Sequence, residues 1–370
     1  MRLRKFEVEN YKNFKDKLAL DLANICNYDF NQICICDDLI KNAVIYGKNG
    51  VGKSNFGRAL MDITAHLVDK YKDIKAPLAY CNADADNDRA WFRYTLADDK
   101  DEIIYEYEKS SPSQLLSERF SINGELVFSY DYERRQEDFS NLLKYDLETL
   151  NWRFLDNGVS VLRYMANNLS LDSEHPIMKL MDFVSNMLWF CSYATQNEYI
   201  GFKAISESMS DYIIRNGHVG GFGDFLKKHD VNETVVAETN LTGQKDLYFV
   251  HKKNLLPFGT AASSGTNSLL TFYYWYVQMK KASFVYVDEF DAFYHFELAE
   301  EIVNLVKEEL DMQVIFTSHN TNLLSNRLLR PDCCFILTKD RLASFAEATD
   351  RELKEGHNLE KLYMSGEFDG

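Results

Sequence analysis

The sequence predicts an α/β protein with a mixed or parallel core sheet, an antiparallel β lobe and a helical insertion. Three observations predict this fold class. A glycine-rich loop joins a short apolar strand to a segment with helical spacing, strand-like segments separated by turn residues occupy 91–132, and two more apolar strands follow residue 280. With 370 residues, 46% of them hydrophobic, the chain can bury the core of one large domain or two small ones.

The N-terminal part predicts a β-hairpin followed by the strand that precedes the glycine-rich loop. Apolar and polar residues alternate from residue 3 to 10, a turn falls at Tyr11-Lys-Asn-Phe14, and the chain returns through 18–22. The apolar run 41–46 suits a buried strand, and residues 55–63 have helical spacing.

The loop between that strand and helix has the sequence Gly-Lys-Asn-Gly-Val-Gly-Lys-Ser, which matches the phosphate-binding pattern G-x-x-x-x-G-K-[ST]. Backbone N–H groups freed by glycine form a concave anion site, and the helix N-terminus adds its positive dipole end. Lys53 is expected to reach the β- and γ-phosphates, and the Ser54 hydroxyl is expected to hold Mg²⁺. The loop therefore predicts binding of a nucleoside triphosphate. The residues expected to contact it here are Gly47, Lys48, Asn49, Gly50, Val51, Gly52, Lys53, Ser54 and Asn55.

The middle of the chain predicts an antiparallel lobe and then helices. Strand-like segments run over 91–96, 102–108 and 125–130. Helical periodicity follows from about 140 to 215. Ser173 as N-cap and Pro176 in the first turn predict a helix whose apolar face includes Met187 and Leu188. The aromatic helix 270–281 either packs in the core or presents a partner surface.

Two acids end a predicted strand over 283–289. Asp288 would bind the Mg²⁺ shell, and Glu289 would polarise an attacking water as a general base, worth roughly 10²–10⁴ in rate. Taken alone the pattern is weak, because acids often follow strands. The next predicted strand, 312–317, precedes His319, which would lie where ligands bind at the carboxyl ends of parallel strands and could sense the γ-phosphate.

Residues Ser263, Ser264 and Gly265 precede the aromatic helix. Free N–H groups and hydroxyls at a helix start can bind an anion, although an ordinary capped helix gives the same pattern.

Together these elements resemble the ABC-type ATPase heads of the RecF/SMC superfamily, with Asn55 after the loop serine as in that branch. The resemblance covers roughly the first 65 and the last 115 residues. It places Ser263, Ser264 and Gly265 on the signature motif, His319 on the switch histidine and Asp291 near the loop that crosses between subunits. The sequence Ser-Ser-Gly-Thr is similar to the signature variant of compact phage-defence ATPases related to the OLD (overcoming lysogenization defect) group. Gln114 and Gln196 are candidates for the family's nucleotide-sensing glutamine.

The resemblance implies an ABC-ATPase head that uses ATP and Mg²⁺. It implies that the signature of one copy completes the phosphate site of another, so that two copies dimerise around two ATP molecules. It divides the chain into an N-terminal ATPase lobe at 1–135, a helical insertion at 136–255 and a C-terminal ATPase lobe at 256–370.

Composition excludes several other classes. The net charge of −16 argues against bulk adhesion to nucleic acid, so any DNA contact must come from a local patch. The candidate patch is the basic N-terminal cluster, which consists of Arg2, Arg4, Lys5, Lys12, Lys15 and Lys17. Its simpler explanation is that these residues are the solvated ends of the hairpin. The seven cysteines are an odd number and do not predict disulfides, and no second Cys/His pair has the spacing that a zinc site needs. Cys34 and Cys36 are expected to lie on one face of a strand, and Cys333 and Cys334 are expected to lie in a buried strand. No apolar stretch is long enough for a membrane span, which predicts a cytoplasmic protein.

Three functions are compatible with these features. The first is an ATPase that regulates or triggers a separate effector, a nuclease or toxin, in bacterial anti-phage defence. This reading follows because long heptad arms are absent and too little chain follows His319 for a nuclease domain. The second is a RecF-like DNA-binding ATPase in repair, and the third is a nucleotide switch that does not hydrolyse.

Overall fold

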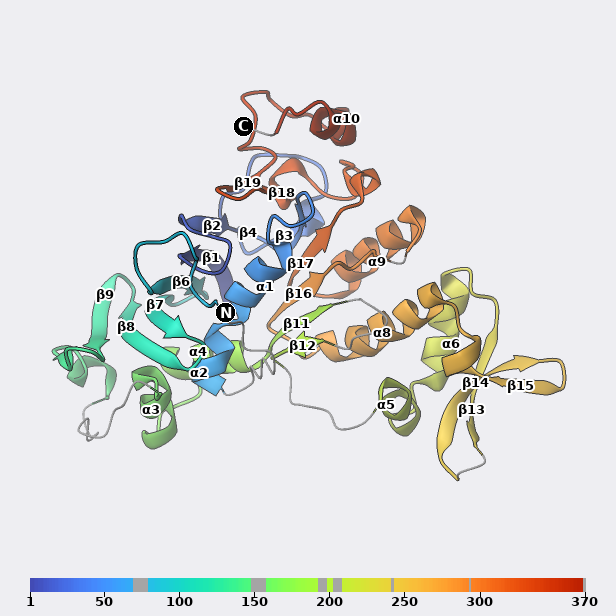
Figure 1. The fold of residues 1–370 in the computed structure, drawn as a ribbon, viewed down its shortest axis with the longest axis horizontal. Coiled ribbons are helices and arrows are strands. Elements are labelled where there is room, and N and C mark those ends of the chain that lie inside the picture. Colours follow the sequence, from blue (N-terminus) through green and yellow to red (C-terminus); the bar gives the residue numbers. More distant parts are fainter. Residues whose placement is uncertain are drawn as a thin grey trace.

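Two seven-stranded sheets enclose the helix that follows the glycine-rich loop (Figure 1). The computed structural model describes residues 1–68, 79–147, 158–191, 198–201, 208–240, 243–292 and 294–368. The predicted α/β class is confirmed, with a mixed core sheet, an antiparallel sheet and helices around them.

The antiparallel sheet has the strand order β10-β9-β8-β7-β6-β1-β2. The predicted N-terminal hairpin is confirmed, with Phe6 opposite Leu20. On its other side β1 pairs with β6, with Phe6 opposite Tyr94, so the hairpin and the β lobe form one continuous sheet. Its strands are β1 (Arg2–Glu9), β2 (Leu18–Asp21), β6 (Ala90–Ala97), β7 (Glu102–Ser111), β8 (Gln114–Ile122), β9 (Glu125–Asp131) and β10 (Gln136–Asp138).

The core sheet has the order β12-β11-β16-β17-β5-β18-β19, and its five central strands are parallel. Every residue of β5, β16 and β17 is buried, as expected for parallel strands covered on both faces. The strands are β5 (Asn42–Tyr46), β11 (Met187–Cys191), β12 (Tyr199–Ile200), β16 (Phe284–Asp288), β17 (Gln313–Ser318), β18 (Cys334–Leu337) and β19 (Leu342–Ser344).

Helix α1 lies between the two sheets. On one side Phe56 packs edge-on against Phe6 at 5.5 Å. On the other side Gly57 faces Tyr286, where an added Cβ would lie 2.5 Å from the ring, so the helix approaches β16 more closely than a side chain would permit. The helices are α1 (Lys53–Met61), α2 (Ile63–Val68), α3 (Val161–Asn168), α4 (Pro176–Ser185), α5 (Met209–Arg215), α6 (Val219–Lys228), α7 (Phe258–Ala261), α8 (Ser264–Met279), α9 (Phe296–Glu309) and α10 (Leu359–Met364).

Helix α8 packs on the opposite face of the core sheet. Successive strand residues point to opposite faces, so Trp189 faces α1 while its neighbour Phe190 stacks on Trp275 of α8 at 5.3 Å. The aromatic run of α8 is buried along its length, which confirms the core interpretation of that helix.

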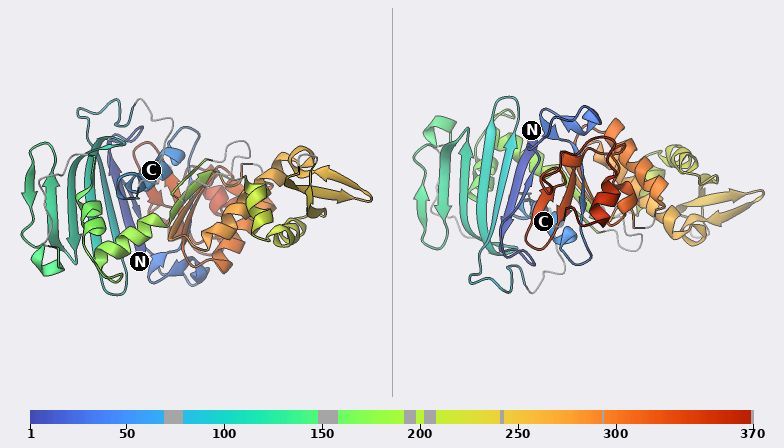
Figure 2. Two further views of the ribbon diagram at one scale, coloured as in Figure 1. Left: turned by 90° about the horizontal axis from the view of Figure 1, so that it is seen from below. Right: turned by 90° about the horizontal axis from the view of Figure 1, so that it is seen from above.

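A three-stranded antiparallel sheet projects at one end of the molecule, next to α5 and α6 (Figures 1 and 2). Its strands are β13 (Thr234–Thr239), β14 (Lys245–His251) and β15 (Asn254–Pro257); a further two-stranded ribbon consists of β3 (Ile35–Cys36) and β4 (Leu39–Ile40). Within the ranges that the structure describes, no helix is both long and apolar enough to cross a membrane.

Several local predictions were wrong. Helix α4 is capped by His175 rather than Ser173, because the His175 Nδ1 accepts the N–H of Ile177. Met187 and Leu188 belong to β11, so the segment predicted to be helical contributes a strand to the core sheet. A continuous apolar run has no periodicity that distinguishes helix from buried strand. The domain boundaries at 135 and 255 stay a prediction.

The cysteine segments also differ from the prediction. Cys34 ends a short 3₁₀ helix, η1 (Gln32–Cys34), instead of alternating with Cys36 on one strand. Cys333 ends another, η5 (Pro331–Cys333), and only Cys334 enters β18; both thiols are buried as expected. The remaining 3₁₀ helices are η2 (Leu143–Tyr145) and η4 (Thr321–Leu323).

Candidate functional site

The glycine-rich loop connects β5 to α1 with two residues in the left-handed region. Gly50 has φ 79° and Gly52 has φ 109°, conformations that other residues adopt at a cost. Gly52 is the N-cap of α1 and no side chain caps the helix, so the first-turn N–H groups are available to an anion. The loop thus has the backbone form that phosphate binding requires.

Asn13, in the turn between β1 and β2, braces the loop. Its amide donates to the Val51 carbonyl at 2.7 Å, and its oxygen accepts from the Asn55 amide at 2.8 Å. A Cβ at Gly52 would come within 2.2 Å of the Asn13 side chain. The side chain of Asn55, which was predicted to bind nucleotide, therefore contacts Asn13.

Lys53 is buried, with 5% of its surface exposed. Its Nζ donates to the Gly47 carbonyl at 2.9 Å and lies 2.7 Å from Nε2 of His319. Burial lowers the pKa of Lys53, and the nearby carboxylates of Asp288 and Glu289 oppose that shift. The ammonium is held inside the loop, where phosphate oxygens would replace its present partners.

Asp288 ends β16 and is 2% exposed. Its Oδ1 accepts from the Thr317 hydroxyl at 2.8 Å, and the Ser54 hydroxyl also donates to the carboxylate. Burial raises the pKa of Asp288, and these hydrogen bonds oppose the shift. Ser54 and Asp288, two residues 234 positions apart in sequence, thus lie next to each other, and their role as a shared metal site stays a prediction.

Glu289 adopts a left-handed backbone conformation with φ 46°, which is rare for a residue with a side chain. Its N–H donates to the Thr317 hydroxyl at 2.8 Å. Among the residues that the structure describes, its carboxylate has no hydrogen bond or ion pair, so it is available to accept a proton.

His319 follows β17 and faces the loop. Desolvation and the adjacent Lys53 ammonium lower the pKa of His319, although the residue is partly exposed to solvent. The preceding Ser318 donates to the Asp291 carboxylate at 2.6 Å, which connects β17 to the segment after Glu289.

The proposed signature residues lie apart from this group. Ser263 caps α8 by accepting the Thr266 N–H at 3.1 Å. This end of α8 lies toward α6 and the small projecting sheet, away from α1 (Figure 1). Within the described ranges, no hydrogen bond joins 263–265 to the loop at 47–55. Within one copy the structure therefore brings together three of the four sequence-predicted elements, namely the glycine-rich loop, the two acids and His319, and leaves the signature outside.

A family model matches residues 43–325, which span the loop, both acids and His319; the family is described as "AAA domain, putative AbiEii toxin, Type IV TA system". The chain belongs to this family. No curated protein matches the chain.

Several solved structures are similar to this AAA-family chain. An SMC head bound to the C-terminal winged-helix domain of ScpA is 14% identical and covers 93% of this chain and 97% of its own, with a TM-score of 0.46. An Smc head with an extended coiled coil, bound to a ScpA C-terminal domain derived from Pyrococcus furiosus, is 13% identical, covers 94% and 97%, and has a TM-score of 0.46. The recombination mediator protein RecF of the RecFOR pathway is 13% identical, covers 92% and 97%, and has a TM-score of 0.40.

The site of this AAA-family member has a donor set that fits a magnesium nucleotide. A hard dication prefers oxygen ligands and is usually held by one or two protein groups together with phosphate. The Ser54 hydroxyl and the buried Asp288 carboxylate would supply such ligands, and the uncapped N-terminus of α1 beside Lys53 would contact the phosphates.

Sequence reasoning missed Asn13, Tyr286 and Thr317. The Tyr286 hydroxyl donates to the Lys53 carbonyl at 2.8 Å, fixing the first turn of α1 on β16. Thr317 stands two residues before His319 at the end of a predicted strand, a position that could have identified it. Of the two glutamine candidates, Gln114 lies in β8 of the antiparallel sheet, and Gln196 lies outside the described residues.

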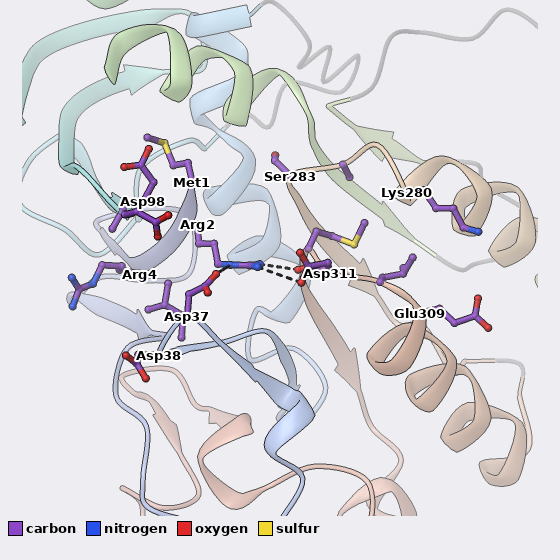
Figure 3. A pocket seen from close by; sticks show the side chains of 16 residues that line it. Met1, Arg2, Arg4, Asp37, Asp38, Asp98, Lys280, Ser283, Glu309 and Asp311 are labelled. Atoms are coloured by element: carbon purple, nitrogen blue, oxygen red, sulfur yellow. Dashed lines mark hydrogen bonds and ion pairs between the residues drawn. The ribbon is translucent and has the colours of Figure 1, made fainter. Parts of the chain in front are cut away.

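An open polar pocket of about 940 Å³ lies at the N-terminal ends of the core-sheet strands β16 and β17, whereas the glycine-rich loop lies at the C-terminal ends (Figure 3). It is lined by Ser283 and Met312, which precede β16 and β17, and Arg2 spans it to contact Asp37 and Asp311. Carboxylates outnumber basic groups around this pocket, which does not suit phosphate.

Proposed function

We propose that the chain binds ATP with Mg²⁺ and hydrolyses it. The observation that supports this most strongly is that Asp288 at the end of β16 and His319 just after β17 both lie beside the glycine-rich loop that follows the adjacent parallel strand β5. Membership of the AAA family agrees with nucleotide use.

Each side chain has a distinct task in this proposal. Mg²⁺, when held by Ser54 and Asp288, offsets charge on the phosphates. Lys53 binds the β- and γ-phosphates as a point charge, and Glu289 accepts a proton from the attacking water because its carboxylate is free. His319, whose pKa is lowered by desolvation and by the Lys53 ammonium, would place a ring nitrogen near the γ-phosphate.

Two substitutions test this assignment. Lys53→Ala should lose ATP binding and phosphate release together, whereas Glu289→Gln should retain binding and lose release. Glu297→Gln, an exposed acid in the first turn of α9, serves as the matched control. Undiminished turnover of Glu289→Gln would overturn the assignment of the base. A wild-type protein that binds ATP without releasing phosphate would instead support the nucleotide switch.

We further propose that two copies associate around ATP, with Ser263, Ser264 and Gly265 of one copy facing the loop of the other. The distance of the α8 N-terminus from the loop within one copy supports this arrangement (Figure 1). An acidic chain repels itself, so bound Mg-ATP is expected to organise the contact.

Subunit mixing tests this arrangement directly. Lys53→Ala and Ser264→Arg should each be inactive alone, because each damages both composite sites of a homodimer. Mixing them yields some dimers with one intact site, so activity should return to about a quarter of the wild-type value, from the statistics of a two-fold assembly. Sedimentation of the Glu289→Gln protein with and without ATP measures the mass of the assembly, which should be larger with ATP. No recovery together with an unchanged mass would contradict the dimer.

The biological role proposed is regulation of a separate effector, a nuclease or toxin, in anti-phage defence. The family description, which names a toxin and a toxin–antitoxin system, supports this direction. Copurification with the products of neighbouring genes, followed by nuclease and toxicity assays of each bound protein, tests it. A chain that recovers no partner under ATP, ADP or nucleotide-free conditions would oppose this role.

A RecF-like DNA-binding role is the second candidate. Its support was the basic N-terminal cluster, but Arg2 pairs with Asp37, Arg4 with Glu102, and Lys17 with Glu7. These ion pairs reduce the charge available to phosphates. Duplex DNA binding measured at several salt concentrations separates the two roles, because phosphate contacts produce a steep decrease in affinity with salt.

A further inference from the structure

The C-terminal end of β17 contacts both acids of the site through a single side chain. The Thr317 hydroxyl donates to Oδ1 of Asp288 at 2.8 Å and accepts the N–H of Glu289 at 2.8 Å. The Thr317 carbonyl also accepts the N–H of Phe290, at 3.3 Å. One residue therefore binds three consecutive positions at the end of β16.

The chemistry of the hydroxyl suits this arrangement. A hydroxyl has one proton to donate and lone pairs that accept, so it can form both bonds at once when the acceptor and the donor approach its oxygen from different directions. Thr317 is fully buried, with no exposed surface, so water cannot replace either bond. Its χ1 is restricted because threonine is β-branched, which fixes the direction of the hydroxyl.

The contact with Thr317 involves a residue, Glu289, whose backbone conformation is unfavourable. At φ 46° this residue holds a conformation that costs energy unless its surroundings stabilise it. The Thr317 hydroxyl stabilises it from the amide side. In doing so it orients the Asp288 carboxylate on one side and the start of the Glu289 side chain on the other.

We propose that Thr317 is a positioning residue that fixes the metal-binding carboxylate of Asp288 and the proton-accepting Glu289 relative to each other. This inference rests on the proposed function of the site. Thr317 does not itself touch nucleotide in this scheme; it acts through the two acids.

Thr317→Val tests the proposal because valine keeps the shape and removes only the hydroxyl. It leaves the Glu289 N–H unpaired and deprives Asp288 of a donor. We expect kcat for ATP to fall on the order of 10- to 100-fold, as for loss of a hydrogen bond to a charged group, with a much smaller change in KM. The Mg²⁺ concentration needed for half-maximal ATP binding should rise. Thr317→Ser, which retains the hydroxyl, should recover most of both properties.

Thr64→Val is the matched control. Thr64 is also fully buried and its hydroxyl donates to the Met61 carbonyl at 2.7 Å, but it lies in α2 outside the site. It should lose stability without altering kcat or the Mg²⁺ requirement. Thermal melts of all variants separate unfolding from altered chemistry.

The outcomes distinguish this inference from the proposed function. If wild type hydrolyses ATP and Thr317→Val matches it in kcat and Mg²⁺ requirement, the positioning role is wrong while the function stands. If wild type binds ATP without hydrolysis, the catalytic function fails, and the Mg²⁺ dependence of binding still decides the role of Thr317. Equal losses in Thr317→Val and Thr317→Ser would also overturn the inference, since the hydroxyl would then be irrelevant.

Discussion

Nζ of Lys53 lies 2.7 Å from Nε2 of His319, so the lysine expected to bind the γ-phosphate contacts the histidine expected to sense it. A lysine ammonium can only donate, so a hydrogen bond between these two atoms requires a neutral ring whose Nε2 accepts. Nucleotide would enter between these two groups and replace one positive neighbour of His319 with negative phosphate oxygens.

This contact predicts how His319 titrates. The pKa of His319 is lowered by desolvation and by Lys53, so as pH falls the ring should gain its proton at a lower pH than an ordinary histidine does. Lys53→Met removes the ammonium and should raise the pKa of His319. NMR titration measures the pKa, with the His319 ring signal assigned by its loss in His319→Gln. A pKa that stays unchanged in Lys53→Met would show that the lysine charge does not act on the ring.

Asn13 is predicted to affect the affinity for nucleotide by holding the glycine-rich loop in shape. Asn13→Ala removes the hydrogen bonds to Val51 and Asn55, so the loop should lose part of its preorganisation. We expect the Kd for ATP to rise about 5- to 10-fold, as for one or two neutral hydrogen bonds. Isothermal titration calorimetry measures it. Asn168→Ala, on an exposed end of α3, is the control and should leave the Kd as in wild type.

The buried ion pair between Lys109 and Asp62 is predicted to be essential for stability. Both side chains are at most 2% exposed, their N–O distance is 2.6 Å, and Tyr80 also donates to Asp62 at 2.8 Å. Lys109→Ala leaves an uncompensated buried carboxylate and should reduce the free energy of unfolding by about 3–5 kcal/mol. Urea denaturation measures it. Lys100→Ala, from an exposed pair with Glu174 at 3.9 Å, should change it by under about 1 kcal/mol.

Two helical glycines should respond oppositely to the same substitution. Gly57→Ala places a methyl 2.5 Å from Tyr286 and should destabilise the protein by about 1–3 kcal/mol despite the better helix propensity of alanine. Gly223→Ala, in α6 with nothing within 4 Å, should stabilise it by about 0.5–1 kcal/mol. Thermal denaturation of both variants compares them. Equal effects would mean that α1 can move away from β16 at little cost.

The sequence predicted the parts of the fold that have strong local signals. The loop 47–54 and the strand that ends at Asp288 depend on residues close together in the chain, and both were located correctly. The aromatic helix was also found, but it begins at Ser264, six residues before the predicted start at 270. β11 was missed because a buried strand has no periodicity of its own.

The contacts within the site could be predicted only in part, because many depend on packing. Asn13 meets Gly52 only because the hairpin turn folds over the loop, and Thr317 meets Glu289 only because β16 and β17 are adjacent. No local pattern specifies such a contact.

The position of β5 has a consequence for how the protein is made. This early strand lies between β17 and β18, which begin at Gln313 and Cys334, near the other end of the sequence. A ribosome that has synthesised the glycine-rich loop has therefore produced neither neighbour of its supporting strand. Nascent chains should acquire affinity for ATP abruptly and late in translation, when the last third of the polypeptide emerges.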